Sequence, residues 1–146
     1  MAARVHAEVA APAEVVFELL ADPQTYVDWE VGSSAVHSSD DDWPAAGAMF
    51  EHSHGIWFAQ LRDSTRVIES DPPRRLRLET RVRPLVVAEV ELEVEPLAAG
   101  SRITMTERVT GGLARMALGP GRDALLALRN REALRRLVRL AEARAG

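Results

Sequence analysis

The chain has 146 residues, of which 47% are apolar and 27% are charged, with a formal net charge of -4. A chain of this size and composition can bury a core without cross-links, so we expect one domain over residues 1–146. It contains no cysteine, which excludes disulfides, thiolate metal ligands and a cysteine nucleophile. Neither a basic-then-apolar leader nor an apolar run of about 20 residues is present, which predicts a cytoplasmic protein without an integral membrane segment.

The charge is unevenly distributed. Residues 121–146 hold seven arginines against three acidic residues, a balance of +4 that leaves -8 for the rest of the net -4. The negative total argues against nucleic acid as a partner. We interpret the arginines as the solvated outer face of a helix, partly paired with acids of a sheet. The alternative is a surface that touches phosphates or anionic lipid.

The N-terminal region predicts one strand followed by two short helices. Residues 4–9 alternate between apolar and polar side chains, as a half-buried strand does. Pro12 suits the first position of a helix that continues to about residue 20. Asp22 then caps a second short helix that begins at Pro23. Tyr26 and Trp29 are expected to pack this helix against the body of the protein rather than to contact a ligand.

From residue 32 to 109 the chain is almost wholly strand-like. Several neighbouring segments alternate with period two, which predicts an antiparallel sheet with one packed and one solvated face. Glutamates on one segment and arginines on the next suit cross-strand pairs on the solvated face. The expected strands cover residues 31–38, 48–54, 61–69, 75–82, 86–95 and 102–109.

The last element is a helix of more than 20 residues, from about Gly121 to Ala143. Apolar residues recur on one side at helical spacing and arginines on the other, so the helix should lie across the sheet. One member of the apolar stripe, Asn130, is polar. The preceding glycine-rich segment, residues 111–121, is the one long connection and has the composition of a mobile flap.

This element order, with several sequence segments, resembles the START-like superfamily of polyketide cyclases and lipid-transport proteins. The segments are APAEVVFELLADPQTYVDW (11–29), WPAAGAMFEH (43–52), DPPRRLRLE (71–79), GSRITMTE (100–107) and RNREALRRL (129–137). The resemblance covers nearly the whole chain. It implies an α+β helix-grip fold, in which a strongly curved antiparallel sheet of about seven strands wraps a long C-terminal helix around an apolar cavity. It supplies no family-wide catalytic motif.

Glu107 is the first candidate for chemistry. It shares the inward phase of its strand with Ile103, Met105 and Val109. A carboxylate in an apolar interior needs a hydrogen-bond partner or a proton. It could therefore act as a general acid or base, or hold a ligand hydroxyl or carbonyl. The alternative places it at the cavity mouth, solvated or paired with an arginine.

Asn130 and two histidines are the other polar candidates. Asn130 could orient a neutral oxygenated ligand or bond the backbone beneath the flap. His52 and His54 share a strand face with Phe50, although Met49 competes with Phe50 for the core position. They could work as pocket acid and base groups or point outward. They lack a third ligand for a metal because Glu51 faces the opposite way, so no metal and no cofactor are expected.

The remaining predicted ligand contacts are mainly apolar and lie on the inner phase of strands, on the helix stripe or at loop tips. Trp57 and Phe58 could cap the cavity entrance opposite Leu113 and Met116, or simply fill the core. Serines such as Ser33 have no evident base at a defined spacing, so a serine nucleophile is not favoured. The full set of predicted contacts is Phe50, Trp57, Phe58, Thr80, Val90, Met105, Met116, Asn130 and Leu134.

Two functional hypotheses lead. The first is binding or transport of a small hydrophobic molecule, such as a lipid, isoprenoid or polyketide-like compound, by a monomer or homodimer. The second is a cyclase, aromatase or dehydratase in which Glu107 and one of the two histidines move protons while Asn130 orients a carbonyl. A third is a protein-interaction module of the chaperone-associated or toxin-like kind that uses the outer sheet face. Fold-level analogy does not choose among them.

Overall fold

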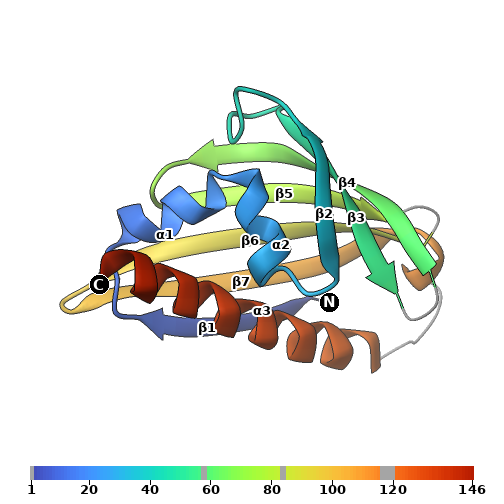
Figure 1. Ribbon diagram of the computed structural model, residues 1–146. Coiled ribbons are helices and arrows are strands. Elements are labelled where there is room, and N and C mark those ends of the chain that lie inside the picture. The colour runs from blue at the N-terminus through green and yellow to red at the C-terminus, as the bar shows by residue number, and fades with distance from the viewer. Residues whose placement is uncertain (1, 57–58, 83–84, 116–120) are drawn as a thin grey trace.

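A computed structural model describes residues 2–56, 59–82, 85–115 and 121–146. Its centre is one antiparallel sheet of seven strands in the order β1-β7-β6-β5-β4-β3-β2 (Figure 1). The α+β helix-grip architecture expected from the sequence is confirmed. The strands are β1 (Ala3–Val9), β2 (Ser33–Ser39), β3 (Met49–Ile56), β4 (Ala59–Asp71), β5 (Arg75–Val82), β6 (Val86–Leu97) and β7 (Gly100–Gly111).

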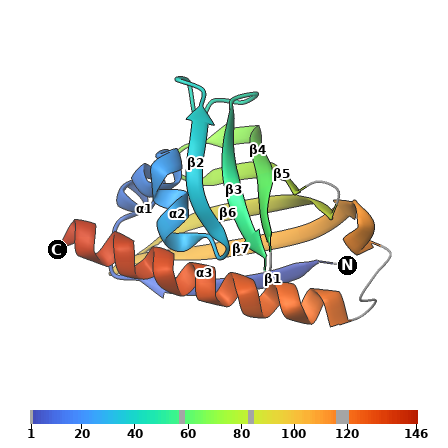
Figure 2. The same cartoon turned by 45° about the vertical axis from the view of Figure 1, so that its right-hand side comes forward.

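The helices α1, α2 and α3 gather on one side of this sheet. In Figures 1 and 2, α3 runs across the sheet beside β1. Both α1 and α2 contact α3, and they also contact β6 and β2, respectively. The described helices are α1 (Ala13–Leu20), α2 (Tyr26–Trp29) and α3 (Gly121–Ala145), with short 3₁₀ turns at Pro23–Thr25 and Leu113–Arg115. None of them combines the length and apolarity needed to cross a bilayer.

The predicted helix starts are close to those observed. Asp22 caps the second helical segment as expected, because its Oδ1 accepts from the Gln24 backbone N–H at 3.0 Å. Pro12 was predicted to occupy the first helical position, but it stands one position before the helix. Its backbone is extended, with φ -67° and ψ 157°, so it is the residue that precedes α1 rather than the first helical residue.

The core forms between the apolar stripe of α3 and the inner face of the sheet. Ala133, Leu134, Leu137 and Ala141 are all buried, and they belong to the same cluster as the inward residues of β1, β6 and β7. Small residues in this stripe let the helix approach the sheet closely. The helix end is further held where Glu142 Oε2 accepts from the Ala10 backbone N–H at 2.9 Å.

The outer face of the sheet carries the predicted charge pairs. Glu89 of β6 stands opposite Arg108 of β7, and their side chains meet at 3.0 Å. Glu95 stands opposite Arg102 at 3.5 Å. Because these pairs are solvated, each contributes little to stability. Their main effect is to keep this face polar.

Leu137 offers a direct test of the helix–sheet interface. Its side chain is 0% exposed, whereas Leu128 on the same helix is 62% exposed. We expect Leu137→Ala to lower the free energy of unfolding by about 2–5 kcal/mol, because it removes buried methylenes and leaves a cavity. Leu128→Ala should change it by less than about 0.5 kcal/mol. Urea unfolding followed by circular dichroism measures both, and equal effects would contradict the placement of α3.

Candidate functional site

A small cavity lies where α2 and the N-terminal half of α3 face strands β4 to β7. Its volume is about 40 Å³, room for about three water molecules. Part of the lining is apolar, and the rest carries polar side chains from α2, β4, β5, β7 and α3 and from the residue after α2. The lining residues are Tyr26, Trp29, Glu30, Val31, Thr65, Leu78, Thr80, Val90, Met105, Glu107, Arg129, Asn130 and Ala133.

Glu107 of β7 reaches the cavity from the sheet and meets α3 there. Its Oε1 accepts from the Asn130 side-chain amide at 2.9 Å and lies 3.6 Å from Arg129 Nη1. Both Glu107 and Asn130 are buried. The bond between them satisfies two polar groups that the inner phase of a strand and the apolar stripe of a helix would otherwise leave unpaired.

Arg129 links this pair to a second carboxyl group, that of Glu30. Glu30 follows α2, and its Oε1 lies 3.8 Å from Arg129 Nη2. The same guanidinium donates to the backbone carbonyl of Val31 at 3.2 Å. One cation therefore stands between two carboxyl groups and ties α3 to the chain between α2 and β2.

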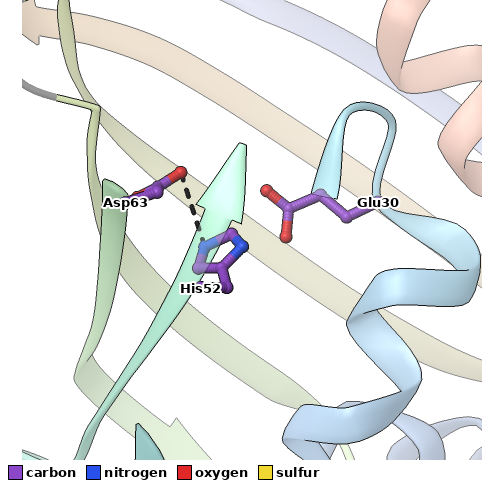
Figure 3. Close-up of side chains that lie close together, drawn as sticks. All are labelled: Glu30, His52 and Asp63. Atoms are coloured by element: carbon purple, nitrogen blue, oxygen red, sulfur yellow. Dashed lines mark ion pairs between the residues drawn. The ribbon is translucent and has the colours of Figure 1, made fainter. Parts of the chain in front are cut away.

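His52 of β3 lies close to Glu30 and contacts several buried polar side chains. Its Nε2 is 3.4 Å from Asp63 Oδ2 and 3.3 Å from Thr65 Oγ1, and its Nδ1 is 2.8 Å from Ser33 Oγ. His52 and Asp63 are direct partners across β3 and β4. Figure 3 shows the carboxyl groups of Glu30 and Asp63 both pointing toward the imidazole. Ser33, for which no partner was evident from sequence spacing, thus has an imidazole nitrogen beside its hydroxyl group.

Burial dominates the electrostatics of both carboxyl groups beside His52. It raises the pKa of Glu30 to about 7, an effect that Arg129 opposes and Glu107 reinforces. It raises the pKa of Asp63 to about 8, with a further increase from the charge of Glu30 and opposition from a backbone N–H of Arg81 and from Arg129. Near neutral pH Asp63 thus keeps its proton and Glu30 keeps one in about half of the molecules, whereas exposed carboxyl groups would have lost theirs.

Trp29 presents a different kind of polar atom to the cavity wall. Its indole Nε1 is buried, and no hydrogen-bond partner for it exists among the residues that the structure describes. Trp43, by contrast, donates its Nε1 proton to the Leu20 carbonyl at 3.1 Å. A buried donor without an acceptor costs free energy, so an oxygen that entered the cavity beside Trp29 would be favoured.

The residues proposed from the sequence fall into three groups. Glu107, Thr80, Val90, Met105 and Asn130 line the cavity. The second group consists of core residues, and the third lies outside the residues that the structure describes. Phe50, His52 and Leu134 are buried in the core but do not line the cavity, while Trp57, Phe58, Met116 and the side chain of His54 lie outside the described residues.

The inward phase of β3 is now resolved, since Phe50 is 1% exposed and Met49 is 40% exposed. His52 is therefore a buried residue rather than one of an outward pair. Tyr26 and Trp29 do pack in the core, as expected, but both also line the cavity. They therefore pack in the core as expected, but their place in the cavity lining, which a ligand could contact, was not expected.

Sequence reasoning missed Glu30, Asp63 and Arg129. Asp63 had a usable signal, because Asp63, Thr65 and Val67 alternate with polar neighbours and so share one face of β4. Glu30 had none, since it stands in a connection without periodicity. Glu30, His52 and Asp63 are also the group of described residues that could hold a metal ion, with one ligand atom from each within 4.8 Å of the others.

Comparison with known proteins supports the fold and the family. Residues 2–142 match the sequence model of a family described as polyketide cyclase/dehydrase and lipid transport. None of the curated protein sequences searched matches the chain.

Solved structures similar to this chain include three that cover nearly all of it. Protein CV1439 from Chromobacterium violaceum is 18% identical with a TM-score of 0.75, over 97% of this chain and 98% of that one. The Zhui aromatase/cyclase from Streptomyces sp. R1128 is 19% identical with a TM-score of 0.76, over 100% and 96%. The di-domain aromatase/cyclase StfQ of steffimycin biosynthesis is 14% identical with a TM-score of 0.78; the match covers 99% of this chain and 52% of StfQ. At these identities the likeness establishes the fold alone.

The raised pKa of Asp63 predicts how stability depends on pH. Folded Asp63 keeps its proton to about pH 8, whereas an unfolded aspartate loses it near 3.8. Between these values the folded state binds more protons, so the free energy of unfolding should fall as the pH rises from about 5 to 8. One such proton changes the free energy of unfolding by at most about 1.4 kcal/mol per pH unit.

Urea unfolding at a series of pH values, with EDTA present, measures that slope. Asp63→Asn should make the slope less steep, because the amide has no proton to lose in this range, and should leave the part that comes from the raised pKa of Glu30. The exposed Asp28 provides the matched control, and Asp28→Asn should leave the slope as it is. A slope that Asp63→Asn does not change would show that burial of this carboxyl is not its cause.

Proposed function

Because the chain belongs to the polyketide cyclase/dehydrase and lipid transport family, we propose that it binds a small, mostly apolar molecule that carries a carbonyl or hydroxyl oxygen. The binding place is the cavity between the sheet and α3. Its walls suit such a ligand, because ligand sites are usually apolar with a few convergent polar groups.

The observation that carries this proposal is the indole N–H of Trp29 in the cavity wall, which has no hydrogen-bond partner within the described part of the chain. An apolar molecule would fill the space beside Leu78, Val90 and Met105, and an oxygen on it would accept from Trp29. Asn130 could add a contact, since an amide both donates and accepts. A ligand oxygen would thus give the buried donor the acceptor that the described residues do not provide.

The partners of Glu107 favour binding over chemistry as the primary role. Glu107 bonds Asn130 and pairs with Arg129, and no histidine contact to it is among the interactions described. A carboxyl group that already has two partners serves mainly to hold the structure and the charge of the cavity lining.

The cavity of about 40 Å³ holds only a few waters, so a ring-sized ligand requires its walls to move apart.

Trp29→Phe tests the role of the indole donor. We expect the wild-type protein to bind acetophenone in preference to cumene, which has a similar shape but no oxygen. Loss of one hydrogen bond should reduce this preference about 2- to 10-fold. The ratio of the two dissociation constants, measured by NMR titration with EDTA present, removes effects of cavity size that both probes share.

Trp43→Phe is the matched control, because it also removes a buried indole, one that does not line the cavity and whose N–H already donates to the Leu20 carbonyl. It should lower stability and leave the acetophenone preference unchanged. If neither probe binds the wild-type protein at millimolar concentration, the proposed cavity ligand is wrong. If both variants change the ratio equally, the indole donor has no special part.

Acid–base catalysis is a second candidate, favoured by the carboxyl groups of Glu30 and Glu107, which both line the cavity. Cyclisation and dehydration of oxygenated carbon chains both need a base beside a carbon next to a carbonyl, and a donor near that carbonyl oxygen. In this role Glu107 removes the proton, and Trp29 donates to the oxygen on which negative charge develops. Asn130 holds Glu107 in place.

Exchange of the methyl protons of acetophenone in D₂O tests this second candidate. Removal of one of these protons by Glu107 gives the enol or enolate, and return of a deuteron from solvent completes the exchange. We expect wild-type protein to accelerate the exchange and Glu107→Gln to lose about 10²- to 10⁴-fold of that acceleration. The exposed Glu95 gives the control Glu95→Gln. Equal rates with and without protein would leave binding as the function.

A further inference from the structure

The group formed by half-buried Glu30 and buried His52 and Asp63 has a feature that binding of an apolar molecule does not require. These three side chains come from three separate places in the chain: the residue after α2, the middle of β3 and the start of β4. One potential ligand atom of each lies within 4.8 Å of the others. His52 and Asp63 are 0% and 3% exposed. Such convergence inside a core costs desolvation energy unless something compensates it.

We propose that Glu30, His52 and Asp63 form a binding site for a divalent transition-metal ion, with Zn²⁺ as the reference ion. One imidazole nitrogen and two carboxylate oxygens are a donor set that suits Zn²⁺, Mn²⁺ and Fe²⁺. This site is separate from the apolar part of the cavity, and its existence does not depend on the proposed organic ligand.

The distances fit this assignment with a limited adjustment. Two ligands on one ion at about 2.1 Å and a tetrahedral angle lie about 3.4 Å apart. The Nε2 of His52 and Oδ2 of Asp63 are already 3.4 Å apart. Glu30 is the ligand that has to approach, and its carboxyl group already points toward the imidazole (Figure 3).

The balance of charge in this region also favours a cation. Three carboxyl groups, those of Glu30, Asp63 and Glu107, interact electrostatically with one another and with one guanidinium, that of Arg129. Arg129 contacts Glu30 and Glu107 directly. A dication between Glu30 and Asp63 would replace the protons that these two carboxyl groups otherwise hold, in a place where low polarity strengthens its attraction to the carboxylates.

His52 has the second hydrogen bond that metal-binding histidines commonly show. Its Nδ1 lies 2.8 Å from the Ser33 hydroxyl, so Nδ1–H can donate there while Nε2 faces Asp63 as a lone-pair donor. Ser33 is thus a positioning residue that orients the ring and selects its tautomer. The hydroxyl of Thr65, 3.3 Å from Nε2, can rotate to leave that lone pair to the metal.

The remaining coordination positions would face the cavity, since Glu30 and Thr65 are part of its lining. A catalytic or ligand-binding metal keeps such positions open, whereas a structural zinc site uses four protein ligands. A carbonyl or hydroxyl oxygen in the cavity could then bind the ion, which would polarise it as a Lewis acid. The site therefore accepts oxygen ligands.

Calorimetric titration of Zn²⁺ into the tag-free, EDTA-treated and dialysed 146-residue chain tests the site, with no organic ligand present. We expect one ion per chain. Glu30→Gln and Asp63→Asn preserve side-chain shape and should each weaken binding about 10-fold or more. Ser33→Ala should weaken it about 10- to 100-fold through the orientation of His52. Circular dichroism confirms that each variant is folded.

Two controls separate this site from surface histidines. The double variant His6→Ala, His37→Ala removes two exposed histidines and should bind Zn²⁺ as the wild type does. Co²⁺ in place of Zn²⁺ should give visible d–d absorption bands that Asp63→Asn abolishes.

Absence of Zn²⁺ binding at 100 µM would overturn the proposal and leave the three side chains as a proton-holding hydrogen-bond network. Binding that survives Asp63→Asn but is lost in the histidine double variant would overturn it equally. Because acetophenone binding is measured separately in EDTA, failure of the metal site and failure of the proposed function are distinguishable.

Discussion

The contact of α3 with the sheet is the constraint on which the rest of the structure depends. Over its C-terminal half, small and branched apolar residues such as Ala133, Leu137 and Ala141 bring the helix close to the sheet. Toward its N-terminal half, the stripe changes at Asn130 to a polar residue that bonds Glu107. This change from apolar to polar contact determines where the core ends and where a cavity with polar groups begins.

Much of the fold could be predicted because its physical signals are local and repeated. Alternation with period two gave the strands, and helical spacing placed Asn130 on the buried side of α3. The same logic placed Glu107 inside, because a strand can present it to one face only. The alternation also indicated the outer pairs, such as Glu89 with Arg108, since register follows from which face is buried.

The candidate site was harder to predict because it combines residues that no local pattern connects. His52 lay in a strand whose phase was ambiguous, and only the burial of Phe50 beside an exposed Met49 resolves it. Asp63 comes next to His52 through pairing of β3 with β4, a contact that requires knowledge of the register. Glu30 arrives from a connection between α2 and β2. Its position depends on the whole arrangement, including the arginine that α3 brings to it.

The placement of Arg129 has a consequence for cooperativity. Its guanidinium contacts both Glu30 and Glu107, so the free energy of ionisation of each carboxyl group depends on the charge of the other. An event that changes the charge at Glu30 alters the hold of Arg129 on Glu107, and the reverse coupling has the same magnitude by thermodynamic necessity. The two carboxyl groups in the cavity lining are therefore energetically linked through a single side chain of α3. A ligand that binds at one of them should change the affinity at the other.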